Sequence, residues 1–452
     1  MADTEGKAYA ILLAGGTGTR LWPVSRELFP KQLVKFIGDD SLVQSTIKRL
    51  SPVLDADCLR IVCGQQHFHE VARHIQDIGL QADGKVICEP SGRNTAPAIL
   101  LAVLNVLNAD PEAVLCVFPA DHVIGEMEGF HERLAAAIRL AGQGFVVTFG
   151  ITPHYPETGY GYVEGGQEVA EGALTINRFV EKPDKKTAQQ YIAAGNFFWN
   201  SGMFAFKASI MLEEFRTYQP GLLGKMSAIY DGTNPIDQAD YDQLPDISFD
   251  YAIMEKTARG VVLPSDFGWS DIGSWKSLYD FLPKDDGLNV IDGDVISNDT
   301  RGCFILGRDR LIATNHLENL VIVETPDSIF VSDIDHSRDV KSIVARLKAT
   351  GRKEYHQHRT VHFPWGSRTL LEQKDAYSVR RLLIYPESTL ETEVTPDAAM
   401  NLIAVKGSVR VDASGKPQDL TPGKTLTVST PGNVKIENRS DKPVYLIQVH
   451  LG

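Results

Sequence analysis

A glycine-rich turn followed by two basic residues is the pattern in this sequence that most clearly indicates chemistry. An apolar run over 9–14 is typical of a buried strand, and it leads into five small residues, Gly15, Gly16, Thr17, Gly18 and Thr19. Glycine adopts backbone conformations that other residues avoid, so such a turn can expose a row of N–H groups to an anion. Arg20 can grip a phosphate with two hydrogen bonds, and Lys31 adds a point charge beside it. The pattern predicts a site for a polyphosphate.

Two common phosphate-binding motifs are excluded here. A Walker loop requires Gly-Lys followed by Ser or Thr, and no such triplet follows these glycines. A dinucleotide fingerprint requires a third glycine at position 21, where the sequence has Leu21. A tight strand-to-helix turn without a ligand is the alternative, and the paired basic residues disfavour it.

Two aspartates are candidates for binding a metal ion. Asp121 follows the apolar run 113–118, and Asp271 lies among small, turn-forming residues over 267–275. Magnesium prefers oxygen ligands, usually one or two carboxylates, with substrate phosphates and water completing its shell. An aspartate after a strand more often caps a helix than binds a metal. Asp266 is the competing choice for the second carboxylate.

Residues 12–31 resemble the signature of sugar-nucleotide pyrophosphorylases, in the form found in bacterial mannose-1-phosphate guanylyltransferases. Six motifs occur in the family order over 8–280, and the resemblance continues to Val449. The resemblance favours Asp271 over Asp266 as the partner of Asp121. It also implies that the glycine-rich turn binds the nucleotide together with three residues of the 89–97 motif, Arg93, Asn94 and Thr95.

The family's substrate loops correspond to further motifs in this sequence. They imply five sugar-phosphate-binding residues, Gly159, Tyr160, Glu181, Lys182 and Asn200. Chemically, a carboxylate such as that of Glu181 can accept hydrogen bonds from two neighbouring sugar hydroxyls, and the Asn200 amide can donate and accept. Lys182 can reach a sugar phosphate if its strand ends there, as Pro183 indicates. Without the other motifs, Glu181 and Lys182 would be read as a solvated ion pair.

The resemblance implies transfer of GMP from GTP to mannose-1-phosphate, giving GDP-mannose and pyrophosphate. The implied catalytic residues are Arg20, Lys31, Asp121, Lys182 and Asp271. The implied cofactor is Mg²⁺ on the two aspartates. The sugar phosphate is itself the nucleophile, so catalysis depends on positioning and charge neutralisation. Two alternatives stay open: the same chemistry on another sugar-1-phosphate (GDP-heptose or another GDP-hexose), and a non-catalytic regulatory subunit.

Composition excludes several other classes of protein. The 452 residues exceed a single core, and the net charge of -13 argues against nucleic acid or an anionic membrane as a partner. The first residues lack the basic and apolar regions of a signal peptide, and no apolar stretch is long enough to span a bilayer. Five cysteines without a C-x-x-C pair indicate reduced thiols in the cytoplasm.

The pattern of elements predicts three domains. Strand-like and helical runs alternate up to about residue 280, which predicts an α/β domain over 1–284 with a doubly wound, mixed and mostly parallel sheet of Rossmann-like type. Short β-rich segments and a helix over 339–349 form a second module, 285–352. It resembles a family dimerisation region, so we expect a homodimer. Residues 353–452 alternate short strands with turns, as in a sandwich or open barrel.

The last domain resembles the cupin domain that gives long family members phosphomannose isomerase activity. Their metal strand, laid without gaps on 390–402, places the histidine positions on Thr395, Pro396, Asp397 and Asn401, the glutamate on Met400 and a later histidine on Val434. No metal-binding set remains, so isomerase activity is predicted to be absent. A nearby histidine group, His356, His358 and His362, is expected to be an exposed linker or arm.

Overall fold

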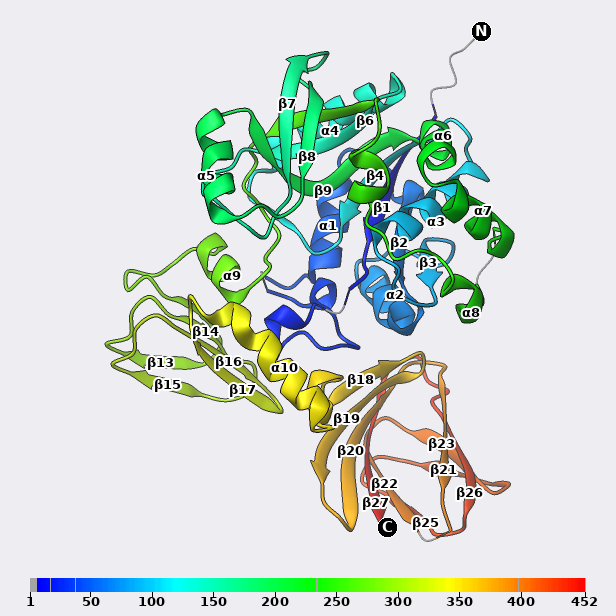
Figure 1. The fold of residues 1–452 in the computed structure, drawn as a ribbon. Coiled ribbons are helices and arrows are strands. Elements are labelled where there is room, and N and C mark those ends of the chain that lie inside the picture. The colour runs from blue at the N-terminus through cyan, green and yellow to red at the C-terminus, as the bar shows by residue number, and fades with distance from the viewer. Residues whose placement is uncertain (1–5, 17, 37, 233–234, 397, 452) are drawn as a thin grey trace.

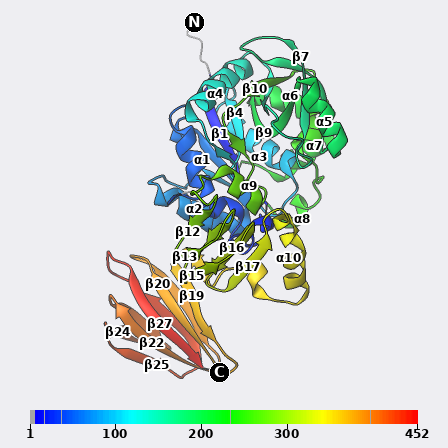
Figure 2. The ribbon, with the colours of Figure 1, turned by 90° about the vertical axis from the view of Figure 1, so that its left-hand side faces the viewer.

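The computed structural model describes residues 6–16, 18–36, 38–232, 235–396 and 398–451. Figures 1 and 2 show an α/β part formed by the chain up to about residue 281, a small β part next to it, and a C-terminal β part beyond helix α10 (Val340–Ala349). The expected architecture of a doubly wound α/β sheet followed by a small β-module and a cupin-like β domain is therefore confirmed.

A nine-stranded sheet forms the centre of the α/β part. Its strands are β1 (Ala8–Leu13), β2 (Leu59–Gly64), β3 (Val86–Glu89), β4 (Val114–Pro119), β6 (Val146–Ile151), β7 (Tyr162–Glu168), β8 (Leu174–Val180), β9 (Phe197–Lys207) and β10 (Gly260–Ser265). They lie in the order β3-β2-β1-β4-β9-β6-β10-β8-β7. Strands β8 and β9 run against the direction of the others, so the sheet is mixed and mostly parallel, as predicted.

Helices cover both faces of this sheet because its central strands are apolar on both sides. Along β1, Ala10 and Leu12 join one core, whereas Tyr9 and Ile11 join the other. The first core is covered by α1 (Leu42–Leu50), α2 (Phe68–Asp77), α4 (Met127–Gly142) and α5 (Lys185–Ala194). The second is covered by α3 (Thr95–Leu107), α6 (Ala208–Tyr218), α7 (Pro220–Ile229) and α8 (Gln238–Tyr241). Burial on both faces is typical of doubly wound sheets, which bind ligands beyond the carboxyl ends of the strands.

The β-module is built mainly from short parallel strands. They are β12 (Val290–Asp292), β13 (Val295–Asn298), β14 (Phe304–Leu306), β15 (Ile312–Asn315), β16 (Leu320–Thr325) and β17 (Ser328–Asp333). Strands β12, β14 and β16 pair in parallel, as do β13 and β15, and β17 closes one edge in the antiparallel sense. A shared core joins Phe304 and Phe330 of this module to Trp22 and Val34 of the N-terminal segment. The module is therefore packed against the residues that follow the glycine-rich turn.

Two sheets enclose a separate core in the C-terminal part. The strands are β18 (Thr360–Phe363), β19 (Gly366–Gln373), β20 (Tyr377–Ile384), β21 (Thr389–Val394), β22 (Ala399–Lys406), β23 (Val409–Ala413), β24 (Lys416–Leu420), β25 (Thr425–Val428), β26 (Gly432–Glu437) and β27 (Val444–Leu451). Their orders are β18-β19-β20-β27-β22-β25 and β21-β26-β23-β24. Met400 and Val434, two of the positions aligned with family metal ligands, are buried in this core, while Asp397 lies outside the described residues.

The segment before β18 is not the exposed arm that was expected. His358 Nε2 donates a hydrogen bond to the Val24 carbonyl at 2.8 Å, and His356 Nδ1 lies 2.9 Å from Glu27 Oε2. Both imidazoles are half-buried, and burial lowers the pKa of His358 to about 4. The expectation was wrong because the linker lies directly against residues 22–29, a contact between segments far apart in the sequence.

Candidate active site

The glycine-rich turn follows β1 directly and begins a short helical turn, Thr19–Leu21. Gly16 and Gly18 adopt positive φ angles of 87° and 56°, which glycine accommodates most easily. A Cβ placed on Gly18 would lie 2.6 Å from Lys31 Cβ, so this glycine allows Lys31 to approach the turn closely. Arg20 is exposed beside it. Thr17 lies outside the described residues.

Two strand pairings bring the candidate aspartates together. Asp121 follows β4, whose carboxyl end lies beside that of β1. Strand β11 (Trp269–Ser270), which precedes Asp271, pairs with β5 (Val123–Ile124) just after Asp121. Lys31 lies between the two: its Nζ is 2.9 Å from Asp121 Oδ2 and also donates to the Asp271 carbonyl. Both carboxylates line one cavity of about 360 Å³ together with Arg20.

The surroundings of these groups determine their charge. Burial alone would raise the pKa of Asp121, but the charges of Lys31 and His122, with hydrogen bonds from Lys31 and the backbone, lower it below its usual value. Burial lowers the pKa of His122 to about 4. Trp269 Nε1 donates to His122 Nδ1 at 3.1 Å, which holds the imidazole neutral with that nitrogen as acceptor. Near pH 7, Asp121 is therefore an anion beside a neutral histidine.

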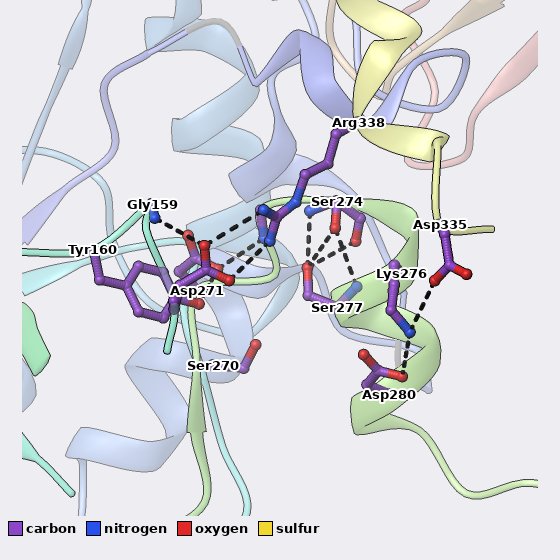
Figure 3. A network of polar contacts seen from close by, with 12 residues as sticks. Gly159, Tyr160, Ser270, Asp271, Ser274, Lys276, Ser277, Asp280, Asp335 and Arg338 are labelled. Carbon is purple, nitrogen blue, oxygen red and sulfur yellow. Dashed lines mark hydrogen bonds and ion pairs between the residues drawn. The ribbon is translucent and has the colours of Figure 1, made fainter. Parts of the chain in front are cut away.

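Asp266 is placed differently from Asp271. Its side chain is largely exposed and lies 3.5 Å from His154 Nε2. Asp271 Oδ1 instead accepts hydrogen bonds from Tyr160 Oη at 2.8 Å and from the Gly273 backbone at 2.9 Å. These contacts hold Asp271 at the cavity wall (Figure 3).

A larger cavity of about 500 Å³ adjoins the first one at Asp121. Gly15 and Gly16 form part of its wall, and so do Arg93, Asn94 and Thr95. Its size is in the range that holds a small-molecule ligand such as a nucleoside. Two walls of the cavity therefore come from the predicted nucleotide-binding segments.

The three predicted residues at the start of α3 have different local roles. Asn94 has a φ of 65° and its side chain accepts a hydrogen bond from Thr95 N, so it caps the helix. Thr95 Oγ1 accepts from the Phe249 backbone at 2.8 Å. Arg93 forms an ion pair of 2.8 Å with Asp242. These contacts hold the start of the helix, with the positive end of its dipole, at the cavity.

Two acidic residues in the wall of this cavity were missed in the sequence. Glu89 is buried, its carboxyl accepts a hydrogen bond from Tyr241 Oη at 2.6 Å, and burial raises its pKa to about 7. Asp250 lines the same cavity, and burial with the nearby charge of Glu181 raises its pKa to about 6. Glu89 was visible in the 89–97 motif, whereas Asp250 lies in a short π-helical segment, Asp250–Met254, without a sequence signal.

A third cavity of about 270 Å³ adjoins the first at Asp271 and Arg20. Gly159, Tyr160 and Lys182, three of the predicted sugar-phosphate-binding residues, line it. Lys182 has a φ of 47°, which turns the chain just after β8 ends at Val180. The lysine therefore leaves the sheet at the point that Pro183 indicated.

Glu181 and Asn200 do not line these three cavities. Asn200 Nδ2 donates to Asp250 Oδ1 at 2.9 Å, and Glu181 acts on the same carboxyl by its charge. A Cβ on Gly161 would lie 2.7 Å from Glu181 Oε2, so this glycine allows close approach of the carboxylate. Both predicted residues thus gather around Asp250, next to the cavities.

The β-module adds two cations that the sequence analysis did not predict. Arg338 and Lys341, just before and within α10, line the third cavity with Arg20 and Lys182. Arg338 NH2 lies 3.1 Å from Glu157 Oε2, and that carboxyl group accepts a hydrogen bond from Gly159 N at 2.8 Å. Figure 3 shows Arg338 reaching toward Gly159, Tyr160 and Asp271. No sequence motif around residues 338–341 indicates that they line a site in the α/β part.

Comparison with known families decides what kind of site this is. The profile described as nucleotidyl transferase matches residues 9–286, which is more than half of the chain. Profiles described as MannoseP isomerase/GMP-like beta-helix domain and mannose-6-phosphate isomerase C-terminal match 293–347 and 350–452. The chain belongs to the nucleotidyl transferase family.

Curated relatives place the chain more finely within the nucleotidyl transferases. It is 39% identical over 448 residues to the xanthan biosynthesis protein XanB of Xanthomonas campestris pv. campestris, covering 98% of this chain and 95% of that protein. It is 37% identical over 464 residues to the mannose-1-phosphate guanylyltransferase ManC of Salmonella typhimurium, covering 100% of this chain and 96% of that protein. A crystal structure from Thermus thermophilus, described as a mannose-1-phosphate geranyltransferase, matches with a TM-score of 0.69 and 34% identity, covering 76% of this chain and 99% of that one.

The donor atoms of this nucleotidyl transferase site fit a magnesium ion shared with phosphates. Within the described ranges, no three His, Cys, Asp or Glu side chains gather as an all-protein metal site. The carboxylates of Asp121 and Asp271 on one cavity leave most of an octahedral shell to phosphate oxygens and water, the arrangement that Mg²⁺ favours.

Among the described helices, none has the length and apolar character needed to cross a membrane.

Proposed function

We propose that this protein transfers GMP from GTP to mannose-1-phosphate and releases GDP-mannose and pyrophosphate. The observation that carries the proposal is the meeting of Arg20, Lys31, Asp121 and Asp271 where a nucleoside-sized cavity joins a second, cation-lined cavity. The full-length relatives named mannose-1-phosphate guanylyltransferase support the same activity.

The reaction needs no nucleophile from the protein. An oxygen of the sugar phosphate forms a bond to the α-phosphorus of GTP as the bond from that phosphorus to the β-phosphate oxygen breaks, and pyrophosphate leaves with that electron pair. Such a transfer depends on alignment and on neutralising charge. The glycine-rich turn and Arg20 hold the triphosphate. Lys182, with Arg338 and Lys341, holds the sugar phosphate in the third cavity.

Asp121 and Asp271 would hold Mg²⁺, which supplies positive charge to the reacting phosphates when bound. Lys31 keeps these aspartates together, because its ammonium group contacts the side chain of one and the backbone carbonyl of the other. Tyr160 orients Asp271 through the hydrogen bond from its hydroxyl. Lys31 keeps the Asp121 carboxylate charged, and His122 beside it is neutral near pH 7.

The proposal is tested by assaying the purified full chain with GTP, Mg²⁺ and a panel of sugar-1-phosphates. Pyrophosphate release is measured for mannose-, glucose- and heptose-1-phosphate. We expect mannose-1-phosphate to give the highest kcat/KM. A higher kcat/KM with another sugar-1-phosphate would mean that the protein carries out the same chemistry to make a different GDP-sugar. The absence of turnover with every sugar-1-phosphate would support a regulatory subunit.

We further propose that the protein forms a homodimer through the β-module. The module exposes apolar side chains that a monomer would leave in water: Ile296 is 61% exposed, Ile329 59% and Val331 58%. Light scattering on the full chain tests the dimer, and an Ile329→Asp variant that stays dimeric would contradict this interface.

Five unpaired cysteines support a reducing compartment such as the cytoplasm.

A further inference from the structure

A fourth cavity, of about 450 Å³, lies where the linker, the β-module and the C-terminal sheet meet. Its wall shares no residue with the three cavities of the active site. The linker contributes 353–354 and 357–359, the turn between β16 and β17 contributes Asp327, and strands β18 to β20 contribute the rest. None of the described positions that align with family metal ligands lines it, so it is distinct from the former isomerase site.

Cationic side chains dominate this cavity. The basic residues in its wall are Lys353, Arg359, Arg368 and Arg380. Within the described part of the chain, none of these four forms an ion pair with a carboxylate. The two acidic residues of the wall are already paired: Asp327 lies 2.7 Å from buried Arg26, and Glu354 lies 2.6 Å from Arg352. The cavity therefore holds excess positive charge in a chain whose net charge is -13.

The sheet register places two of the arginines on one face. Leu370 of β19 pairs with Arg380 of β20, and Arg368 is two residues before Leu370, so the three side chains share a face. Burial, together with the charge of Arg380, lowers the pKa of Arg368. Like charges gathered without a counter-charge are unfavourable unless an anion joins them. Gln357 and Gln373 add neutral hydrogen-bonding groups to the wall.

The linker that lines this cavity also forms hydrogen bonds with the segment between Arg20 and Lys31. Leu28 N donates to the His356 carbonyl at 2.8 Å, and Trp22 Nε1 donates to the Glu354 carbonyl at 2.8 Å. Arg26 also donates to the Glu354 carbonyl. A shift of the linker on ligand binding would therefore act directly on the segment that joins the two phosphate-binding cations.

We propose that this junction cavity binds a second, phosphorylated small molecule, carrying a phosphate or diphosphate group, and that its occupancy changes the affinity of the active site for GTP. The four basic side chains would contact the phosphate oxygens, and arginines match phosphate geometry with paired hydrogen bonds. The volume suits a sugar phosphate or a nucleotide. The coupling to GTP rests on the proposed function, whereas the binding step does not.

The binding step is tested by calorimetric titration of the full chain with inorganic pyrophosphate, mannose-6-phosphate and GDP-mannose. The test variant is Arg368→Gln/Arg380→Gln. The matched control is Arg381→Gln, because Arg381 is exposed on the opposite face of β20. For at least one probe we expect the wild type and the control to bind one molecule more per chain than the double variant. Equal numbers of sites in all three proteins, for every probe, would overturn the proposal.

A folding defect in the double variant would not decide the question, so thermal unfolding and the basal rate of GDP-mannose formation are measured alongside. Lys353→Gln/Arg359→Gln serves as the second variant, because both side chains are exposed on the linker before β18. The coupling step is read from the KM for GTP with and without the probe. We expect a change of about threefold or more in the wild type and none in the variants. Binding without this change would overturn the coupling.

Discussion

Arg20 and Lys31 differ in how firmly the fold holds them. Lys31 is 6% exposed and is bonded to both aspartates, so it is part of the packed site. Arg20 is exposed, and its side chain has no ion-pair partner among the described residues. Removing Arg20 should therefore change catalysis with little effect on folding, whereas removing Lys31 would also leave the Asp121 carboxylate without its cation and the Asp271 carbonyl without its donor.

We expect Arg20→Gln to lower kcat/KM for GTP on the order of 10²–10³-fold, as for other preorganised contacts to a developing charge. Steady-state pyrophosphate release measures the effect. The control is Arg216→Gln, an exposed arginine near the end of α6 that lines none of the active-site cavities. A rate within twofold of wild type in Arg20→Gln would remove this arginine from the proposed mechanism.

Asp271→Asn keeps the acceptor oxygen used by Tyr160 and Gly273 but removes the negative charge. We expect kcat/KM to fall about 10²-fold and the Mg²⁺ concentration for half-maximal activity to rise, because a magnesium ligand is lost. Asp266→Asn is the matched control and should behave as wild type, since Asp266 faces His154. If Asp266→Asn loses activity and Asp271→Asn behaves as wild type, Asp266 is the metal ligand instead.

At the scale of elements, helix starts and strand ends position the site. The capped start of α3, the carboxyl ends of β1 and β4, and the approach of α10 each supply one wall of the linked cavities. Strands β1 and β4 and helix α10 correspond to the apolar runs over 9–14 and 113–118 and to the helix predicted over 339–349. Strand β7 has a weak sequence signal because Gly165 and Gly166 interrupt its apolar pattern, and β3 has one because it is only four residues long.

The contribution of α10 is tested by Arg338→Gln/Lys341→Gln. We expect the KM for mannose-1-phosphate to rise about tenfold, because charge-assisted hydrogen bonds of ~1.5 kcal/mol or more would be lost. The KM for GTP should change less. Arg346→Gln, exposed near the other end of α10, is the control. If the kinetics of the double variant are unchanged, the role of Arg338 is limited to its ion pair with Glu157, and it does not bind substrate.

Helices α1 and α2 are joined by a buried histidine whose protonation should weaken the fold. His74 of α2 accepts a hydrogen bond at Nε2 from Arg73 and donates one from Nδ1 to Ser41 Oγ, the cap of α1, and burial lowers its pKa to about 3. The unfolded chain binds this proton near pH 6.5, so the stability is fully present above that pH and is lost as the pH falls toward 3.

Urea unfolding of the wild type between pH 6.5 and pH 5 should show a loss of stability from this one group that steepens toward about 1.4 kcal/mol per pH unit. His74→Gln should have a shallower pH dependence, and His69→Gln, exposed on the same helix, should keep that of the wild type. Equal slopes in the wild type and His74→Gln would show that His74 is not held neutral.

At the scale of the whole molecule, the chain joins an active site to a cupin-like domain whose interior is filled. Met400 and Val434 are buried where the family alignment places metal ligands, and Gln448 Nε2 contacts Met400 Sδ at 2.8 Å. Apolar packing at these positions stabilises the sheets without leaving ligands for an ion. The domain can therefore serve in assembly, or in ligand binding at the junction cavity that its strands β18 to β20 line.

We predict that the full chain, supplied with Zn²⁺ or Co²⁺, does not convert mannose-6-phosphate to fructose-6-phosphate. The same preparation must form GDP-mannose, which shows that the chain is folded. A coupled assay for fructose-6-phosphate measures the reaction. Turnover that requires the added metal would contradict the interpretation of residues 390–402.

The sequence by itself determined the family, the alternating α/β pattern and the types of residue that meet the phosphates, because these depend on local spacing and on side-chain chemistry. Only the tertiary structure decided that Asp121 and Asp271 share a cavity and that α10 and the linker reach the segment around Arg20. The contacts that build this arrangement join residues 90 to 334 positions apart, from Lys31 with Asp121 to Val24 with His358. They depend on how three packed units meet, and no local pattern encodes that geometry.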